Sequence, residues 1–235
     1  MEGPQSVREA VAHRADLVRD LYVTASASTR HTEIVAAATT AGLAVHEVSD
    51  EVLARMGDTE APQGLLAVCT IPASSLDDVL RARPRLICVL VNVRDPGNAG
   101  TVLRGADAAG ADAVVVTDSS VDLFAPKAVR SSAGSLFHLP VVTGVPVTDL
   151  VPQLRSAGMT LFAADGAADL QIGDVDLSGP HAWVMGNEAH GLDDEVRAAC
   201  DHAVRVPVYG AAESLNLAMA ATLCLYASAT AHRRG

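Results

Sequence analysis

Apolar and polar positions follow two patterns along the chain, and each change of pattern marks a new element. Apolar residues spaced three or four positions apart predict helices, whereas short apolar runs between turn residues predict strands. The predicted helices are residues 6–20, 29–41, 50–56, 76–81, 99–109, 127–136, 148–157, 193–200 and a long final helix from residue 215. The predicted strands are residues 21–25, 44–48, 65–71, 86–93, 113–117, 141–143, 160–164, 182–185 and 203–207. This alternation predicts an α/β fold with mostly parallel strands.

A linker divides these elements into two predicted domains. Residues 72–84 are bracketed by Pro72 and Pro84 and are richer in polar residues than the flanking strands. The strand predicted at residues 86–93 follows at once and is apolar almost throughout, as expected for a central parallel strand. A chain of 235 residues is long enough for two such domains. The predicted division is a domain at residues 1–72, a linker at 73–84 and a domain at 85–235.

The composition predicts a sizeable core and restricts the nucleic-acid-binding classes. Hydrophobic residues make up 49% of the chain and aromatic residues only 3%, so Ala, Val and Leu must fill the interior. The formal net charge of −11 argues against a protein that coats nucleic acid non-specifically, because such binding rests on Lys and Arg. Local basic patches remain compatible with this charge. Lys127 is the only lysine, so all other residues in the combined count of Lys and Arg are arginines, which suit bidentate phosphate contacts.

The cysteines and the apolar segments both favour a cytoplasmic protein. Cys69, Cys88, Cys200 and Cys224 form neither a CxxC pair nor a metal-binding spacing, so we expect reduced core thiols. No signal peptide is recognisable. The uncharged stretch at residues 214–231 is rich in alanine and carries hydroxyl and amide side chains. It therefore predicts a buried or interface helix and no membrane span.

A polar loop follows the strongest strand and opens the next helix. Residues 95–97 predict a turn, and Asn98 is well placed as the N-cap of the helix. In open α/β sheets ligands bind at the carboxyl ends of strands, which makes this loop a candidate site. Arg104, one turn into the helix, either serves this site or pairs with Asp107. Neither GxGxxG nor GxxxxGK[ST] occurs, so nicotinamide dehydrogenases and P-loop NTPases lack their motifs here.

Two further loops combine glycine with polar residues. At residues 184–192 (VMGNEAHGL), two glycines flank Glu188, which suits either a backbone wrapped around a small ligand or an ordinary turn. His190 in this loop is either a proton shuttle or a solvent-facing side chain. At residues 206–216 (VPVYGAAESLN), Ser214 is a natural N-cap for the final helix. It lacks the GxSxG context of a nucleophile.

In this order, the three loops resemble a known family. NxRDPxNxGxxxR, VMGNExxG and VPxxxxxESLNxxxA resemble the three motifs of the SpoU (TrmH-like) branch of the SPOUT methyltransferases. Members use S-adenosylmethionine to methylate ribose 2′-hydroxyls in RNA. The resemblance covers residues 85–232. The first domain resembles, more weakly, the L30e-like substrate-binding domain of the ribosomal-RNA members through LYVTASAS and APQGLLAVC.

This resemblance implies a fold, a cofactor site and a set of catalytic residues. The C-terminal domain is expected to contain a deep trefoil knot and to form a homodimer through it. The residues matching the cofactor-binding positions are Gly186, Val206, Pro207, Leu215 and Asn216. The residue matching the catalytic arginine is Arg104, and the polar residues matching its surroundings are Asn98, Glu188, Ser214 and Asn216. The reaction needs no metal, so we expect none.

The same resemblance implies an RNA substrate and excludes DNA, because the reacting 2′-hydroxyl exists only in RNA. The N-terminal domain favours 23S ribosomal RNA, with transfer RNA as the alternative. The candidate RNA-binding residues are Arg8, Arg14, Arg94 and Arg130. Ribosomal-RNA members usually carry a basic segment before the position matching Glu2, so this start is either truncated or a true difference. The remaining alternatives are a non-catalytic RNA-binding protein on the same scaffold and an unrelated small-molecule enzyme.

Overall fold

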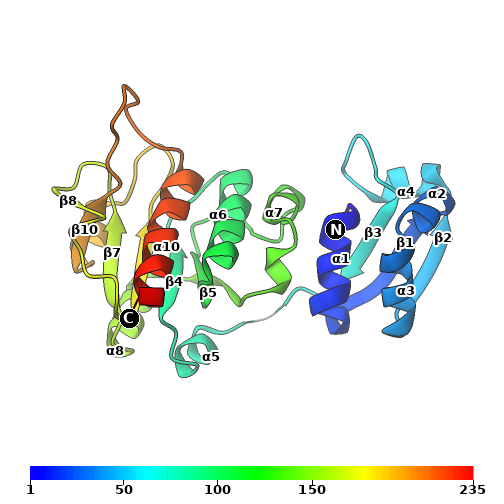
Figure 1. Cartoon of the computed structure of the whole chain (residues 1–235), viewed down its shortest axis with the longest axis horizontal. Coiled ribbons are helices and arrows are strands. Elements are labelled where there is room, and N and C mark those ends of the chain that lie inside the picture. Colours follow the sequence, from blue (N-terminus) through cyan, green and yellow to red (C-terminus); the bar gives the residue numbers. More distant parts are fainter. Residues whose placement is uncertain (73, 235) are drawn as a thin grey trace.

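Two β-sheets, each with its own helices, lie side by side along the long axis of the molecule (Figure 1). The structure is a computed structural model that describes residues 1–72 and 74–234. Ala73, in the predicted linker, and Gly235, at the predicted end of the second domain, lie outside these residues. The smaller sheet belongs to the N-terminal part of the chain and the larger sheet to the C-terminal part.

The smaller sheet has three strands in the order β2-β1-β3, with β1 parallel to β2 and antiparallel to β3. Its strands are β1 (Val18–Thr24), β2 (Ala44–Val48) and β3 (Leu65–Cys69). The helices around it are α1 (Pro4–His13), α2 (Ala25–Arg30), α3 (Thr32–Thr40) and α4 (Asp50–Met56). Buried Val7, Leu21 and Ile34 join α1, β1 and α3 in one core.

Two helix predictions in this part are wrong. The helix predicted at residues 6–20 ends at His13, because Val18, Leu21 and Val23 are needed as buried positions of β1, and a short 3₁₀ turn (Ala15–Leu17) leads into that strand. The pattern predicted one helix at residues 29–41, but the chain forms α2 and α3, which are separated at His31. In the first case packing against the sheet overrides the local pattern.

The larger sheet has seven strands in the order β6-β5-β4-β9-β7-β10-β8, and every recorded pairing is parallel. The strands are β4 (Leu86–Leu90), β5 (Ala113–Thr117), β6 (Val141–Val145), β7 (Thr160–Ala164), β8 (Leu170–Gln171), β9 (His181–Met185) and β10 (His202–Arg205). The predicted parallel α/β architecture is therefore confirmed. The short β8 was not predicted, because a strand of two residues is too short to show an alternation of apolar and polar positions. Strand β4 lies between β5 and β9 with every residue buried, as predicted for a central strand.

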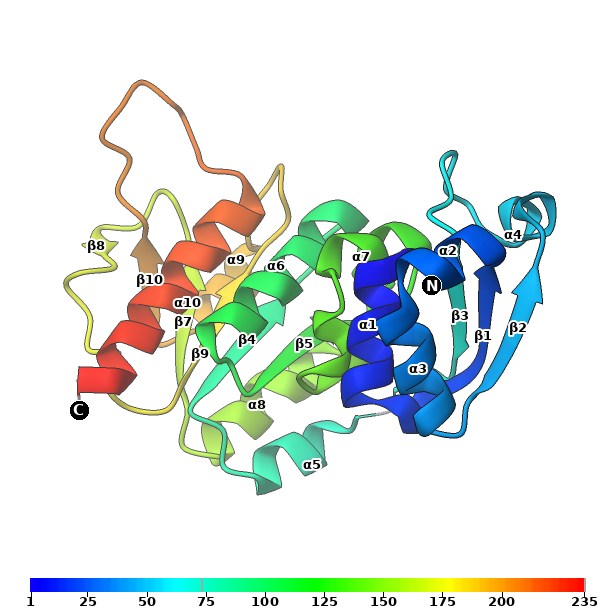
Figure 2. The ribbon, with the colours of Figure 1, turned by 45° about the vertical axis from the view of Figure 1, so that its right-hand side comes forward.

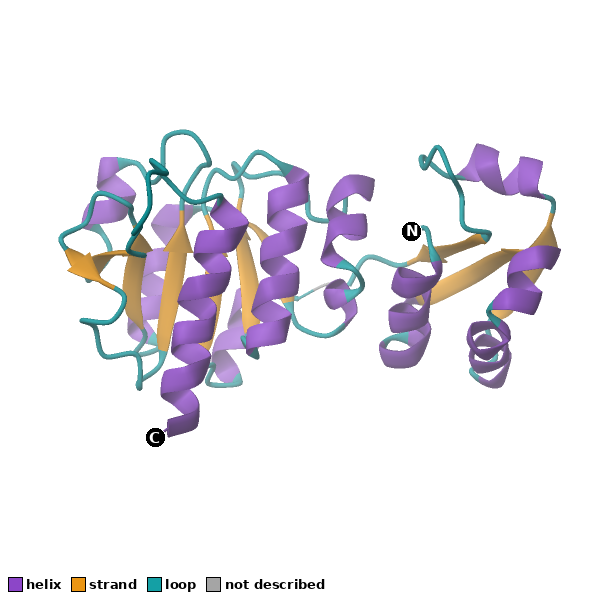
Figure 3. Ribbon diagram, turned by 45° about the horizontal axis from the view of Figure 1, so that its top comes forward, coloured by secondary structure: helices purple, strands orange, loops and turns teal. Residues whose placement is uncertain are grey.

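Helices cover both faces of the larger sheet (Figure 3). The helices are α5 (Leu76–Arg81), α6 (Pro96–Ala109), α7 (Pro126–Ser132), α8 (Val147–Ser156), α9 (Asp194–Ala198) and α10 (Leu217–Arg234). Side chains of a strand point alternately to the two faces. Cys88 and Leu90 thus pack with α6 and α10, while Val89 packs with Leu150 and Leu154 of α8 on the other face.

Helix α1 joins the two parts of the molecule. It lies beside the segment that carries α7 and a short 3₁₀ helix, Ser135–Phe137 (Figure 2). Val7 of α1 and buried Leu136 belong to one continuous hydrophobic cluster, which also includes residues of β4 and α10. The N-terminal sheet is therefore held against the larger unit through α1 as well as through the linker.

Helix α10 has a buried face and an exposed face. Ala221, Cys224 and Ser228 are buried, whereas Met219 and Leu223 are exposed by 60% and 47%.

No helix among the described residues is long and apolar enough to cross a membrane. All four cysteines are free thiols. Cys88, Cys200 and Cys224 are buried and Cys69 is partly buried, so the predicted core position is confirmed for three of them.

Candidate functional site

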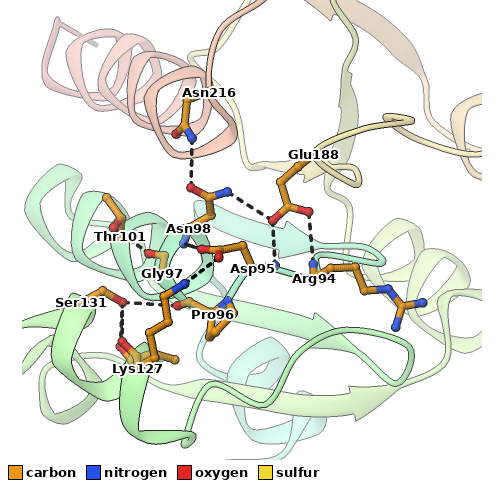
Figure 4. Close-up of polar contacts among 11 residues, drawn as sticks. Arg94, Asp95, Pro96, Gly97, Asn98, Thr101, Lys127, Ser131, Glu188 and Asn216 are labelled. Carbon is orange, nitrogen blue, oxygen red and sulfur yellow. Dashed lines mark hydrogen bonds and ion pairs between the residues drawn. The ribbon is translucent and has the colours of Figure 1, made fainter. Parts of the chain in front are cut away.

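The loop between β4 and α6 is fixed by a helix cap that differs from the predicted one. The carboxylate of Asp95 accepts a hydrogen bond from the Asn98 backbone N–H at 2.7 Å, and Pro96 occupies the first turn of α6. Asp95 is thus the N-cap, and the prediction that Asn98 caps the helix is wrong. Lys127 of α7 donates to Asp95 at 2.8 Å, and this contact and the cap lower the pKa of the Asp95 carboxyl. The Asn98 side chain remains free to reach other loops (Figure 4).

Glu188, in the loop after β9, binds the loop after β4. Its carboxylate accepts from the backbone N–H groups of Arg94 and Asp95, each at 3.1 Å, and from the Asn98 amide at 3.3 Å (Figure 4). Partial burial raises the pKa of this carboxyl, but hydrogen bonds from its own backbone, Arg94, Asp95 and Asn98 outweigh that effect. The net shift is downward, so Glu188 is an ionised acceptor.

The third loop joins this network through Asn216. The Asn216 amide donates to the Asn98 side-chain oxygen at 3.0 Å, and its own oxygen accepts from the Ala218 N–H at 2.9 Å. Asn216 therefore caps α10, which begins at Leu217; the prediction that Ser214 is the cap is wrong. One chain of hydrogen bonds runs from the start of α10 through Asn98 to Glu188. The three loops predicted to carry the chemistry meet at the carboxyl ends of β4, β9 and β10.

Two adjoining clefts open beside this network. A cleft of about 750 Å³ is lined by the polar ends of the first two loops, including Asn92, Arg94, Asn98 and exposed His190. A second cleft of about 660 Å³ lies among the loops after β7, β9 and β10. The predicted residues that line the second cleft are Gly186, Val206, Pro207, Leu215, Ser214 and Glu188. Asn216, also predicted to bind the cofactor, is not part of that lining.

Gly186 is required by the path of the loop after β9. Asn187 and Gly191 exchange two backbone hydrogen bonds at 2.8 and 2.9 Å, so the loop returns on itself. A Cβ atom at position 186 would lie 2.3 Å from the carbonyl carbon of Gly191, closer than any side chain tolerates. Glycine therefore permits the close crossing that shapes the floor of the second cleft.

Arg104 lies apart from this network. It is exposed on α6, six residues beyond Asn98 and so about 240° further around the helix. It forms no ion pair with any residue that the structure describes. The alternative pairing with Asp107 is not formed, because Asp107 instead binds Ser135 and His138. The guanidinium group is thus free to meet a ligand from outside.

The predicted RNA-binding arginines have different surroundings. Arg8 pairs with Glu33 at 2.9 Å and Arg14 with Asp16 at 2.9 Å. Arg130 lies 3.7 Å from Glu2. The remaining member of the set, Arg94, lines the first cleft. The local basic character expected of these four is therefore partly offset by neighbouring carboxylates.

Two residues that shape the site were not among the predicted site residues. Asn92 adopts a left-handed backbone (φ 54°), and its carbonyl accepts from the Asn187 amide at 2.8 Å. Asparagine tolerates this conformation better than most residues. Lys127 binds Asp95 from a helix 32 positions away. Asn92 is the first residue of the first motif and could have been predicted as a site residue for that reason, whereas no local sequence pattern points to Lys127.

Both parts of the chain match known families. The sequence profile of the SpoU rRNA methylase family matches residues 85–226, and a profile described as RNA 2′-O ribose methyltransferase substrate binding matches residues 1–75. The chain is 37% identical, over 83% of its length and 74% of the relative's, to the 23S rRNA (guanosine(2553)-2′-O)-methyltransferase RlmP of Bacillus subtilis. It is 33% identical to the 23S rRNA (guanosine-2′-O-)-methyltransferase RlmB of Bordetella pertussis, over 97% of this chain and 95% of that protein.

Solved structures show the same similarity. The SpoU methyltransferase AviRb from Streptomyces viridochromogenes, in complex with AdoMet, superimposes with a TM-score of 0.82 and 34% identity, covering 98% of this chain and 90% of that one. An AdoMet-bound rRNA methyltransferase from Sinorhizobium meliloti gives a TM-score of 0.83 at 29% identity, covering 97% of this chain and 85% of that one. The similarity thus extends over both parts of the molecule.

Proposed function

The chain belongs to the SpoU rRNA methylase family, and from this premise we propose that it transfers a methyl group from S-adenosylmethionine to a ribose 2′-hydroxyl of 23S ribosomal RNA. The observation that carries the proposal is the hydrogen-bonded chain Asn216–Asn98–Glu188, which joins three loops beside a cleft of cofactor size. The two relatives named above are 23S rRNA 2′-O-methyltransferases by name, and their similarity to this chain covers 83% and 97% of its length.

The second cleft suits S-adenosylmethionine in size and charge. Its volume of about 660 Å³ lies within the range of small-molecule sites. Asp165, Glu188 and Glu213 line it together with Arg205, so the lining offers carboxylates to the sulfonium and ammonium charges of the ligand and a guanidinium to its carboxylate. We propose that Gly186 and the segment from Val206 to Leu215 hold the cofactor largely through their backbone groups. When bound, it supplies an activated methyl group.

We propose that the protein groups position the RNA and stabilise charge on the 2′-oxygen, while the hydroxyl proton passes to the adjacent phosphate or to water and the sulfonium becomes a neutral thioether. Arg104 acts as a cation that holds the adjacent phosphate and stabilises the developing negative charge. Glu188, Asn98 and Asn216 are positioning residues that fix the loops on either side of the clefts. Holding the oxygen in line with the methyl group supplies much of the rate acceleration.

Further parts of the proposal concern the rest of the molecule. Residues 1–72 form the RNA-binding domain, residues 73–84 the linker and residues 85–235 the catalytic domain. The match of residues 1–75 to a substrate-binding profile supports the first assignment. Exposed Met219, Leu223 and Tyr226 on α10 support a homodimer that covers this apolar face. Because the loops after β9 and β10 share one cleft, we place the family's knot there.

The decisive experiment supplies methyl-labelled S-adenosylmethionine with separate pools of unmodified ribosomal and transfer RNA. We expect 2′-O-methylnucleosides in the ribosomal pool, at least a hundredfold fewer with Arg104→Ala, and little recovery with Arg104→Lys, which keeps the charge and loses the planar fork. Arg155→Ala is the matched control, because Arg155 lies on α8 across the sheet and pairs with Asp201.

The remaining outcomes separate the alternatives. Label confined to the transfer-RNA pool would reassign the substrate. Cofactor binding with no label in either pool would contradict activity on free RNA and favour a ribosomal particle, which the same assay on subunits tests. Failure to bind the cofactor at all would favour a non-catalytic RNA-binding protein on this scaffold.

A further inference from the structure

Three potential metal ligands meet where the N-terminal part contacts the C-terminal part. Glu9 and His13 lie one turn apart on α1, and His138 follows the 3₁₀ helix Ser135–Phe137. The Glu9 carboxylate lies 3.1 Å from His138 Nε2 and 3.4 Å from His13 Nε2. One ligand atom from each residue lies within 4.8 Å of the others, and no other such group of three occurs within residues 1–72 and 74–234.

The spacing of these atoms fits a small tetrahedral ion. Zinc–ligand bonds of about 2.0–2.1 Å place tetrahedral ligand atoms about 3.3 Å apart. Both separations from Glu9 are close to that value, and the ligand nitrogens of His13 and His138 lie within 4.8 Å of each other. Two imidazoles and one carboxylate are also a ligand set that zinc accepts, leaving one position for water. The His13 side chain is 53% exposed, which gives an ion a route from solvent.

A second layer of hydrogen bonds orients His138 for this purpose. Its Nδ1 lies 2.7 Å from the Asp107 carboxylate, which also accepts from the Ser135 hydroxyl at 2.7 Å. Metal-binding histidines almost always donate their second nitrogen to a carboxylate or carbonyl. Asp107 therefore fixes the tautomer in which Nε2 of His138 faces Glu9 with its lone pair available to a metal.

Backbone geometry holds Glu9 in the cluster. Gly134 has φ +100°, and a Cβ atom there would lie 2.4 Å from Glu9 Cγ. The glycine thus lets α1 approach the segment after α7 closely enough for Glu9 to sit between the two histidines. Their rings are 4.4 Å apart between centroids.

We propose that Glu9, His13 and His138 form a site for a divalent transition metal, Zn²⁺ in the first place, that fastens α1 to the C-terminal part of the molecule. The ion accepts the lone pairs of His13 Nε2, His138 Nε2 and the Glu9 carboxylate, and any proton bound to these three groups is released to solvent. The site is structural and does not depend on the proposed methyl transfer. It differs from the expectation of no metal, which rested on cysteine spacing and on the reaction.

The test is equilibrium dialysis of the full chain, stripped of metal by a chelator, against Zn²⁺ with elemental analysis. We expect one zinc per chain in the unaltered protein and in the control His46→Ala. His46 is a fair control because it is also partly exposed and bonded to a carboxylate, Asp20 at 2.8 Å, without a third ligand. His13→Ala should lose the site, and Asp107→Asn should weaken it about 10–100-fold.

A second readout uses Co²⁺ in place of Zn²⁺. The visible absorption of tetrahedral cobalt should appear with the unaltered chain and be absent from His13→Ala. Circular dichroism of each variant confirms that it is folded. The proposal is overturned if the unaltered chain takes up less than one equivalent of zinc, or if His13→Ala binds zinc as tightly as the unaltered chain. Either result would leave the three residues as a hydrogen-bonded contact between the two parts.

Discussion

The two ends of strand β9 are both tied to helix α10, but the two ties differ in burial and charge. At the amino end, His181 and Trp183 bond to the hydroxyl of Ser228 at 2.7 and 2.8 Å, and all three side chains are buried. At the carboxyl end, Glu188 binds Asn98, which in turn binds Asn216 just before α10. This second tie borders both clefts.

The difference in surroundings sets the charge of each tie. Burial, more than any other cause, lowers the pKa of His181 to about 4, so this histidine is neutral. Its Nδ1 donates to the Gly179 carbonyl at 2.8 Å, and its Nε2 therefore accepts from Ser228. Glu188 is instead an anion held by backbone N–H groups. A neutral network whose buried polar groups have hydrogen-bond partners stabilises the fold, whereas an ionised network beside open clefts is available to bind ligands.

Activity should respond most strongly to a substitution at the carboxyl end. Glu188→Ala releases the loop after β4 from the loop after β9, and a displacement of about 1 Å can cost about a hundredfold in rate. We expect methyl transfer to fall by about that factor, while the free energy of unfolding changes by less than about 1 kcal/mol, since Glu188 is exposed. Single-turnover rates and urea unfolding measure the two quantities.

The matched control for that substitution is Glu195→Ala. Glu195 is an exposed carboxylate on α9 that lines neither cleft. It should leave both quantities unchanged. A Glu188→Ala protein that loses stability but keeps its rate would reverse the roles assigned to the two ends.

The next effect is on stability at the amino end. Ser228→Ala removes the acceptor of the Trp183 indole N–H and the donor to His181, which leaves buried polar groups without partners. Such a loss costs about 1–3 kcal/mol. We expect the free energy of unfolding to fall by about 2 kcal/mol with the methyl-transfer rate retained well below the melting temperature. A change in rate without a change in stability would contradict this prediction.

The smallest effect is a pH dependence of stability that arises from His181. Its pKa is about 4 in the folded chain and about 6.5 when unfolded, so acid charges the unfolded state first. Stability is therefore complete above about pH 6.5 and declines as pH falls towards 4. Linkage gives a loss of about 1 kcal/mol between pH 6.5 and 5.5.

Comparison with His181→Gln isolates this contribution, because the variant lacks the titrating ring. Urea unfolding of both proteins at the two pH values supplies the measurement. Parallel losses in the two proteins would assign the pH dependence to other histidines. The Glu188 tie should persist through this window, since the lowered pKa of Glu188 means that it protonates only at more acidic pH.

Local patterns in the sequence predicted most of the elements. Strands β5 and β7 and helix α5 have the bounds that their apolar patterns indicate. The three motifs placed Asn98, Glu188 and Asn216 in candidate loops before any contact was known. The predictions fail where contacts between residues distant in the sequence decide the structure. The helix predicted at residues 6–20 ends early because the residues that follow form β1, which pairs with β3.

Local sequence patterns were enough to predict the parallel α/β class, the loops that carry polar residues and the core position of Cys88, Cys200 and Cys224. These follow from residue period, turn chemistry and burial preference, which are properties of short segments. Three features emerge only when the chain folds: Asp95 and Asn216 cap their helices, Arg104 is exposed without an ion pair to any described residue, and His138 meets Glu9 across 129 positions. Such contacts depend on how sheets and helices pack, because hydrogen bonds between distant residues leave no periodic trace in the chain.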